Sequence, residues 1–180
     1  MIKNINLKSG IGKIYFNKKL QLKNKIKLNK IIDNILFSLD SKKDIFYSFS
    51  KNFNLNFKYS QLTKFNKYKS VILIGMGGST LGAKAIYSFF RDKIKKKFIF
   101  LDNLDQLKIE KIKKNVNLNS SLFIIISKSG NTLETLINSS LFKDKITNKN
   151  TIIITERRTN LLNTFAKNKK ILLIDHRDYI

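Results

Sequence analysis

Residues 127–132 read Ser-Lys-Ser-Gly-Asn-Thr and place three hydroxyl side chains within six positions. The hydroxyls of Ser127, Ser129 and Thr132 can each donate a hydrogen bond to a phosphate oxygen, and Lys128 adds a positive charge. A helix that follows this turn would add unpaired backbone N–H groups and the positive end of its dipole. The segment is therefore a candidate phosphate-binding loop.

Two residues of the same segment also fit a simpler role at the start of a helix. Asn131 and Glu134 stand three residues apart, as an N-cap residue and its reciprocal partner do, which predicts that the helix begins here. Ser, Asn and Thr also mark ordinary turns before helices. The pattern alone leaves both interpretations open, a binding loop and a capped turn.

Glycine is rare in this chain, and five of its seven glycines lie in two short segments. Four fall in residues 75–82, which read Gly-Met-Gly-Gly-Ser-Thr-Leu-Gly, and the fifth is Gly130. Each segment follows a short apolar run. Glycine allows positive φ and lets the backbone approach a ligand closely, and ligands of open α/β sheets bind beyond the carboxyl ends of strands. The chemistry is therefore expected at these two segments.

The first of these segments also resembles a dinucleotide fingerprint. Gly75 and Gly77 begin a G-x-G-x-x-G pattern, and Asp102 ends the next apolar run, where a ribose-binding acid would lie. The sixth position is Thr80, although close helix–strand packing favours a smaller residue there. A dinucleotide site would leave residues 127–132 without a role, and no Gly-Lys-Ser or Gly-Lys-Thr forms a Walker A motif.

Five apolar runs alternate with helix-length segments in the second part of the chain, and they predict strands that are buried on both faces. Amphipathic helices are expected at residues 133–141 and 161–166. This alternation favours right-handed βαβ crossovers and a three-layer α/β domain with a five-stranded parallel sheet. The predicted strands are Val71–Ile74, Phe98–Leu101, Leu122–Ile126, Thr151–Thr155 and Ile171–Asp175.

Residues 1–68 carry helical periodicity without a catalytic pattern, and we expect an amino-terminal helical segment. The apolar stripe is Leu28, Ile31, Ile32, Ile35, Leu36 and Leu39. Four phenylalanines, at positions 46, 49, 53 and 57, continue the helical spacing and predict a second helix. We interpret both stripes as packing surfaces, because a phenylalanine stripe at helical spacing is more often core than a base-stacking surface.

The net charge of +24 comes from 36 Lys and Arg against 12 Asp and Glu, and it raises the possibility of nucleic-acid binding. Composition favours another cause. The chain holds 32 Lys, 21 Asn and 27 Ile but four Arg and three Ala, which is the bias of an AT-rich genome. Arg, rather than Lys, makes the bidentate contacts of specific recognition. We therefore expect no specific nucleic-acid partner and a solvated, Lys-rich surface.

Other classes are excluded by what the chain lacks. It has no Cys and a single His, His176, so disulfides, thiolate chemistry and a Cys- or His-rich metal site are absent. We expect neither a metal nor a cofactor. No apolar run reaches the roughly 18 residues of a membrane helix, and the first ten residues lack the apolar stretch of a signal peptide. These features predict a cytoplasmic protein that does not bind a membrane.

The two segments together resemble the paired motifs of the glucose-6-phosphate isomerase family. Residues 75–82 are similar to G-I-G-G-S-x-L-G, and residues 127–135, Ser-Lys-Ser-Gly-Asn-Thr-Leu-Glu-Thr, are similar to S-K-T-x-T-T-x-E-T. Their order, their position after strands and their separation agree with the family. The resemblance covers residues 69–180 and implies a sugar isomerase (SIS) domain that binds a phosphosugar.

The resemblance also implies roles for single residues. The hydroxyls of Ser127, Ser129 and Thr132 would hold the phosphate of a hexose 6-phosphate, with the backbone of Lys128 nearby. Gly78 and Ser79 would line the sugar. Ser129 and Asn131 stand where the family more commonly has Thr, so the first keeps a hydroxyl and the second does not.

The catalytic groups of the family have no counterpart here. Isomerisation of glucose 6-phosphate and fructose 6-phosphate needs a base near C1 and C2 and a cation for the enediol oxygen. In the family these roles resemble a Glu, a His, a Lys and an Arg in G-G-R-x-S, and none of these motifs occurs in this chain. His176 does not match the family's His motif, and Glu134 fits capping better than proton transfer. We expect the amino-terminal, phosphosugar-binding part of such an isomerase, without catalytic residues; full-length members are expected to be homodimers.

The sequence leaves three alternatives open. A phosphosugar-sensing SIS module without enzymatic activity would share the sheet and the hydroxyl-rich turn, but such regulators usually carry a helix-turn-helix domain, and residues 1–68 show none. A dinucleotide-binding oxidoreductase would bind a nicotinamide cofactor. A basic nucleic-acid-binding protein would show strongly salt-dependent binding to DNA or RNA.

Overall fold

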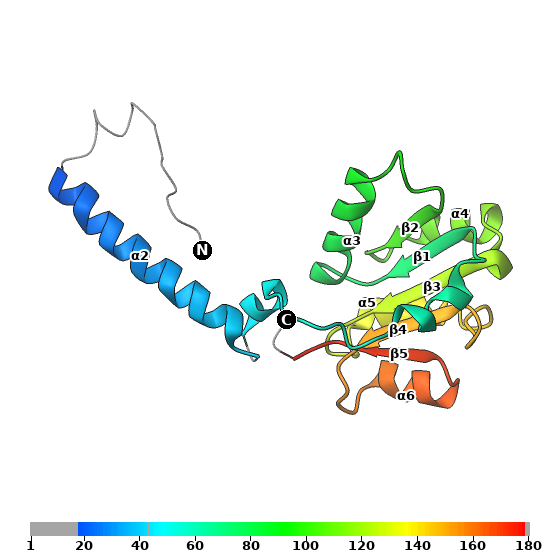
Figure 1. The fold of residues 1–180 in the computed structure, drawn as a ribbon. Coiled ribbons are helices and arrows are strands. Elements are labelled where there is room, and N and C mark those ends of the chain that lie inside the picture. The colour runs from blue at the N-terminus through cyan, green and yellow to red at the C-terminus, as the bar shows by residue number, and fades with distance from the viewer. Residues whose placement is uncertain (1–17, 43, 179–180) are drawn as a thin grey trace. The chain divides into compact units, whose positions relative to one another are not determined.

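The computed structural model describes residues 18–42 and 44–178 (Figure 1). The chain divides into two compact units. The described residues up to Asn54 belong to the first unit, and Leu55–Asp178 form the second. The second unit contains all five strands and both glycine-containing segments, so it carries the candidate site.

The first unit is built around one long helix, α2, over Lys18–Asp40. The helix predicted from the apolar stripe is therefore confirmed. Leu28 and Ile31 of that stripe remain about half exposed within the structure. No helix among the described residues is long and apolar enough to cross a membrane.

The second predicted helix, over the four phenylalanines, is wrong. The chain instead forms a short 3₁₀ helix, η1, over Ile45–Phe49. The side chain of Asp44 accepts a hydrogen bond from the Phe46 amide at 2.9 Å, and Ser50 Oγ accepts one from the Asn52 amide at 3.1 Å. These local side-chain contacts satisfy backbone groups outside an α-helix, and they outweigh the periodicity of the phenylalanines.

The second unit is organised around one sheet of five strands in the order β2-β1-β3-β4-β5, in which every neighbouring pair is parallel. All five predicted strands are confirmed, with starts shifted by no more than one residue. The apolar runs gave a clear signal because helices or loops cover both faces of the sheet. The strands are β1 Ser70–Ile74, β2 Lys97–Leu101, β3 Ser121–Ile126, β4 Thr151–Thr155 and β5 Leu172–Asp175.

Three helices cover one face of the sheet: α4 over Gln106–Asn115, α5 over Leu133–Ser140 and α6 over Leu161–Asn168. The helices predicted near residues 133 and 161 are confirmed. The main core lies here, centred on Phe123, whose ring lies 5.8 Å from that of Phe142. The fully buried apolar residues of this core include Ile72, Ile74, Leu101, Phe123, Ile125, Ile153 and Leu162.

The opposite face is covered by α3, over Gly78–Phe89, and by two short 3₁₀ helices, η2 over Tyr59–Gln61 and η3 over Thr63–Phe65. The Tyr87 ring of α3 lies 5.0 Å from that of Phe98 on β2. A second core cluster joins Phe65 and Tyr68 to the sheet. Residues 55–68 thus pack with the sheet, and the fold is a three-layer α/β domain with a parallel sheet, as predicted.

The main core provides a first test of this arrangement. Replacing Phe123 with Ala should lower the free energy of unfolding by about 3–5 kcal/mol, because Phe123 is fully buried and a cavity would remain. Urea denaturation measures the change. Leu107→Ala is the control, since Leu107 on α4 is 69% exposed and its replacement should change stability by less than about 0.5 kcal/mol. Equal losses in the two variants would contradict the described core.

Candidate functional site

The two glycine-containing segments meet at one edge of the sheet, because they follow the neighbouring strands β1 and β3. The chain runs from β1 towards β2 on one side and from β3 towards β4 on the other, so the strand order reverses between them. Open α/β sheets bind ligands at such a switch point, beyond the carboxyl ends of the strands. A Cβ on Gly75 would lie 2.8 Å from the Ile126 carbonyl oxygen, which shows how closely the two segments approach.

The segment after β1 leads directly into α3. Gly77 is the N-cap residue and has φ +52°, a conformation that glycine adopts without strain. Thr80 is buried, and its hydroxyl donates to the Gly77 carbonyl oxygen at 3.1 Å. Gly78 is exposed and Ser79 is half-buried. A Cβ on Gly78 would meet nothing within 4 Å, so the surface at this residue is open.

Residues 127–132, which we call the hydroxyl loop, are held by hydrogen bonds within the loop. Ser127 is buried; its Oγ accepts from the Gly130 amide at 3.1 Å and lies 2.8 Å from Thr132 Oγ1. Ser129 Oγ accepts from the Asn131 amide at 3.3 Å. The structure thus brings two of the predicted hydroxyls into direct contact and places the third in the same turn.

Helix α5 begins at Leu133, as the amphipathic pattern predicts, but its N-cap residue differs from the prediction. Its N-cap residue is Thr132, whose side chain makes no capping hydrogen bond, so the interpretation of Asn131 as the N-cap is wrong. Asn131 Oδ1 instead accepts from the Leu161 amide at 2.9 Å, at the start of α6. Glu134 lies half-buried in the first turn of α5. The missing side-chain cap leaves this end of α5 available to an anion.

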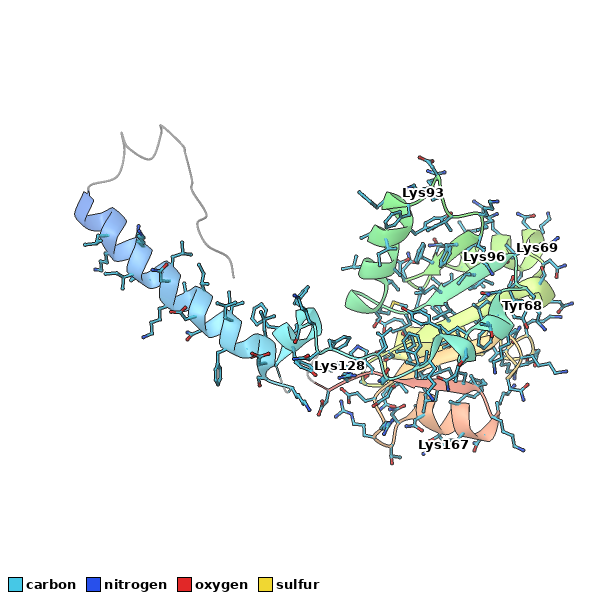
Figure 2. The ribbon with its side chains drawn as sticks, in the orientation of Figure 1. Tyr68, Lys69, Lys93, Lys96, Lys128 and Lys167 are labelled. Carbon is cyan, nitrogen blue, oxygen red and sulfur yellow. The ribbon has the colours of Figure 1, made fainter. Side chains whose placement is uncertain are left out.

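Lys128 lies in the hydroxyl loop with an exposed side chain. Its Nζ donates to the Asp178 carbonyl oxygen at 3.0 Å. Its own carbonyl oxygen accepts from the Glu156 amide at 3.1 Å and from Thr155 Oγ1 at 3.3 Å. Figure 2 shows Lys128 at the opposite end of the sheet from Tyr68. The two hydrogen bonds that its carbonyl oxygen accepts fix the Lys128 backbone to the end of β4.

Asn160 is a site residue that the sequence analysis missed. It is buried, caps α6 by accepting from the Asn163 amide at 2.8 Å, and lies against Gly130 of the hydroxyl loop. The Leu162 amide donates to the Gly130 carbonyl oxygen at 3.2 Å. The available signal was an Asn directly before an apolar helical run, following a strand whose end faces the same edge of the sheet.

Asp102 does not have the environment of a ribose-binding acid. Its carboxylate accepts a hydrogen bond from Lys84 Nζ of α3 and lies 3.6 Å from Lys108 Nζ of α4. The hydrogen bond from Lys84, reinforced by the charges of both lysines, holds the pKa of Asp102 below its usual range. Asp102 thus joins the two helices that flank β2.

His176, to which the sequence analysis assigned no catalytic role, lies just after β5, away from the switch point. Its amide donates to the Thr155 carbonyl oxygen at 2.9 Å and its Nδ1 lies 2.9 Å from the Arg177 carbonyl oxygen. In residues 18–42 and 44–178, no three His, Asp or Glu side chains gather as a metal site would require.

Comparison with known proteins shows the family of this chain. The family model described as phosphoglucose isomerase matches residues 33–179. The chain belongs to the phosphoglucose isomerase family. The hydroxyl loop and the glycine-containing segment after β1 both lie within the matched residues. The likeness stated from the two motifs is therefore confirmed at the level of the family.

This chain matches individual members of the phosphoglucose isomerase family over only part of the length of those proteins. A glucose-6-phosphate isomerase of Methanocaldococcus jannaschii is 42% identical over 123 residues, which are 68% of this chain and 29% of that protein. A glucose-6-phosphate isomerase from Borreliella burgdorferi is 37% identical over 121 residues, which are 63% of this chain and 22% of that protein. The crystal structure of a glucose-6-phosphate isomerase from Chlamydia trachomatis has the same fold, with a TM-score of 0.58 at 24% identity over 68% of this chain and 25% of that one. The chain thus spans less than a third of these proteins.

The close approach of β1 and β3 makes a prediction for Gly75. Replacing Gly75 with Ala should lower the melting temperature, because the new Cβ would meet the Ile126 carbonyl oxygen of the sheet. Gly82→Ala is the matched control. A Cβ on Gly82 meets nothing within 4 Å, and Ala in a helix is favoured over Gly by about 1 kcal/mol, so this variant should be as stable as the parent or more so. The opposite ranking would contradict the contact.

The Asp102 ion pairs predict a pH dependence. A carboxyl group with a lowered pKa stabilises the fold above its unfolded-state pKa, and this contribution is lost as the pH falls through the folded-state pKa. Asp102→Asn should therefore cost stability at pH 7 and progressively less below pH ~4. Urea denaturation from pH 7 to pH 2.5 measures the difference. A difference that is constant with pH would contradict the assignment.

Proposed function

We propose that this chain is the phosphosugar-binding portion of a glucose-6-phosphate isomerase and that it binds the phosphate of glucose 6-phosphate and fructose 6-phosphate. The observation that carries the proposal is the hydroxyl loop of a phosphoglucose isomerase family chain at the switch point of the sheet, beside a helix end without a side-chain cap. The negative phosphate and the positive, amino-terminal end of the α5 dipole would attract each other there.

The hydrogen bonds of the hydroxyl loop suggest how it would present donors to a phosphate. The Gly130 amide occupies one acceptor position of Ser127 Oγ. If Ser127 then donates to Thr132, the Thr132 hydroxyl hydrogen is left for the ligand. In this proposal Thr132, Ser129 and the first amides of α5 contact the phosphate. Ser127 orients Thr132, and the Lys128 backbone completes the loop.

The sugar would extend from the phosphate towards the segment after β1. Gly78 and Ser79 are the proposed lining residues on this side, because Gly75 brings their segment against the end of β3. The absence of a side chain at Gly78 would allow a hydroxyl-bearing ligand to approach the backbone closely.

The proposed role excludes independent catalysis by this chain. Moving a proton between C1 and C2 needs a base and a cation at the enediol, and the chain carries none of the family's motifs for these groups. The relatives in which the reaction is named extend well beyond the matched part, which is 29% and 22% of their lengths. We propose that the remaining groups come from such further sequence and that the complete enzyme is a homodimer.

Binding tests the proposed phosphate contact. Thr132→Val keeps the shape of the side chain but removes its hydroxyl, and it should weaken glucose 6-phosphate binding roughly ten- to hundredfold, because a hydrogen bond to a charged group contributes about 1.5–3 kcal/mol. Isothermal titration calorimetry measures the affinity. The control is Thr63→Val, in an exposed turn of η3 far along the chain from the loop. Equal affinities for Thr132→Val and the parent would contradict the site.

Turnover tests the division of roles. The purified 180-residue chain should bind glucose 6-phosphate but should convert no fructose 6-phosphate to glucose 6-phosphate above the uncatalysed background. A coupled assay with a dehydrogenase specific for glucose 6-phosphate, run from fructose 6-phosphate, detects the reaction. Turnover well above background would show that this chain holds catalytic groups that the proposal leaves out.

A further inference from the structure

Besides its internal hydrogen bonds, the hydroxyl loop is held by the amino-terminal end of another helix, α6. The first backbone amides of α6 all have partners: the Leu161 amide donates to Asn131 Oδ1 at 2.9 Å, and the Leu162 amide donates to the Gly130 carbonyl oxygen at 3.2 Å. The Asn163 amide donates to Asn160 Oδ1 at 2.8 Å. Two of these three acceptors belong to the hydroxyl loop. The loop therefore caps α6, whereas α5 has no side-chain cap.

Asn160 connects this helix end to the loop. Its Nδ2 donates to the carbonyl oxygens of Glu156 and Arg158, both at 3.1 Å, and to Thr155 Oγ1 at 3.3 Å. Thr155 Oγ1 in turn donates to the Lys128 carbonyl oxygen at 3.3 Å. A buried carboxamide with all of these partners has one orientation, since any rotation would leave polar atoms unpaired.

The position of this carboxamide determines which residue the loop can hold at 130. A Cβ on Gly130 would fall on the Oδ1, Cγ and Nδ2 atoms of Asn160. Gly130 also has φ +70°, where other residues are strained. Its amide donates to Ser127 Oγ, the group that contacts Thr132. The Asn160 carboxamide thus packs against Gly130, which lies two hydrogen bonds away from the proposed phosphate donor, Thr132.

We infer that Asn160 is a positioning residue for phosphosugar binding, which clamps Gly130 so that Ser127 and Thr132 hold their orientation before the ligand arrives. The inference rests on the proposed function. Pre-organisation raises affinity because the bound geometry does not have to be ordered at the moment of binding. Asn160 needs no contact with the ligand for this effect.

Asn163 provides a matched control. It is also a buried asparagine of α6, and its Nδ2 donates to the Arg157 carbonyl oxygen at 3.0 Å and to the Arg158 carbonyl oxygen at 3.3 Å. These hydrogen bonds of its side chain lie in the turn between β4 and α6, and not in the hydroxyl loop. Replacing either asparagine with Ala should cost stability, but only the loss of Asn160 should loosen the loop.

The test compares amide hydrogen exchange and glucose 6-phosphate affinity in the Asn160→Ala and Asn163→Ala chains. Exchange at Gly130 is divided by exchange at Phe123, whose amide donates to the Asn150 carbonyl oxygen within the core, so that a global loss of stability cancels. Asn160→Ala should raise this ratio and weaken binding, each by up to about tenfold, because the lost carboxamide contacts are neutral hydrogen bonds, each of which contributes at most about that factor. Asn163→Ala should leave both within about twofold.

Further variants separate capping from clamping. Asn160→Asp keeps an oxygen for the Asn163 amide and loses the Nδ2 donor, so the exchange ratio should rise as in Asn160→Ala while α6 stays capped. Gly130→Ala should also raise the ratio, and combining it with Asn160→Gly should restore part of the order, because the clash is then relieved.

The measurements distinguish a failure of the Asn160 clamp from a failure of the proposed function. An unchanged exchange ratio in Asn160→Ala would overturn the clamp even if the parent chain binds glucose 6-phosphate. A parent chain that does not bind glucose 6-phosphate would contradict the proposed function, while the exchange ratio would still decide whether Asn160 orders the loop.

Discussion

The parallel pairing of β1 with β3 is the constraint on which the site depends. The register runs from Ser70 opposite Ser121 to Ile74 opposite Ile125, and the two serine hydroxyls lie 2.7 Å apart at the start of the pair. Because both strands end at the same edge of the sheet, their pairing alone brings the Gly75 turn and the hydroxyl loop together. Burial of the apolar strand residues on both faces therefore also fixes the position of the polar loops.

The two helix ends at this edge are used differently. The amides of α6 are occupied by Asn131, Gly130 and Asn160, whereas the N-cap residue of α5, Thr132, makes no capping hydrogen bond. One helix end thus holds the loop, and the other is the end at which we propose that the phosphate binds. In a chain with a net charge of +24, overall electrostatic attraction for phosphate is not selective. Selectivity would come from hydroxyls and amides held in fixed directions.

The sheet was predictable because strands buried on both faces have nearly continuous apolar runs, as at Leu122–Ile126. The failures have a common cause. Local polar contacts of Asp44 and Ser50 overrode the phenylalanine spacing, and Asn131 serves a helix that begins thirty residues later in the chain. Asn160 was missed for the same reason. Periodicity reports which face is apolar, but it does not report which polar partner a turn finds, whether two residues away or far along the chain.

We propose that the hydroxyl loop, rather than the general positive charge, selects the ligand. The most direct measurement is a titration of the ¹⁵N-labelled chain with glucose 6-phosphate, followed by amide chemical shifts, with glucose and sulfate as references. We predict saturable shifts at residues 128–135 and at Gly78 and Ser79 with glucose 6-phosphate, and none with glucose. Shifts spread over surface lysines such as Lys64, Lys67 and Lys170, equal for sulfate and sugar phosphate, would contradict the account.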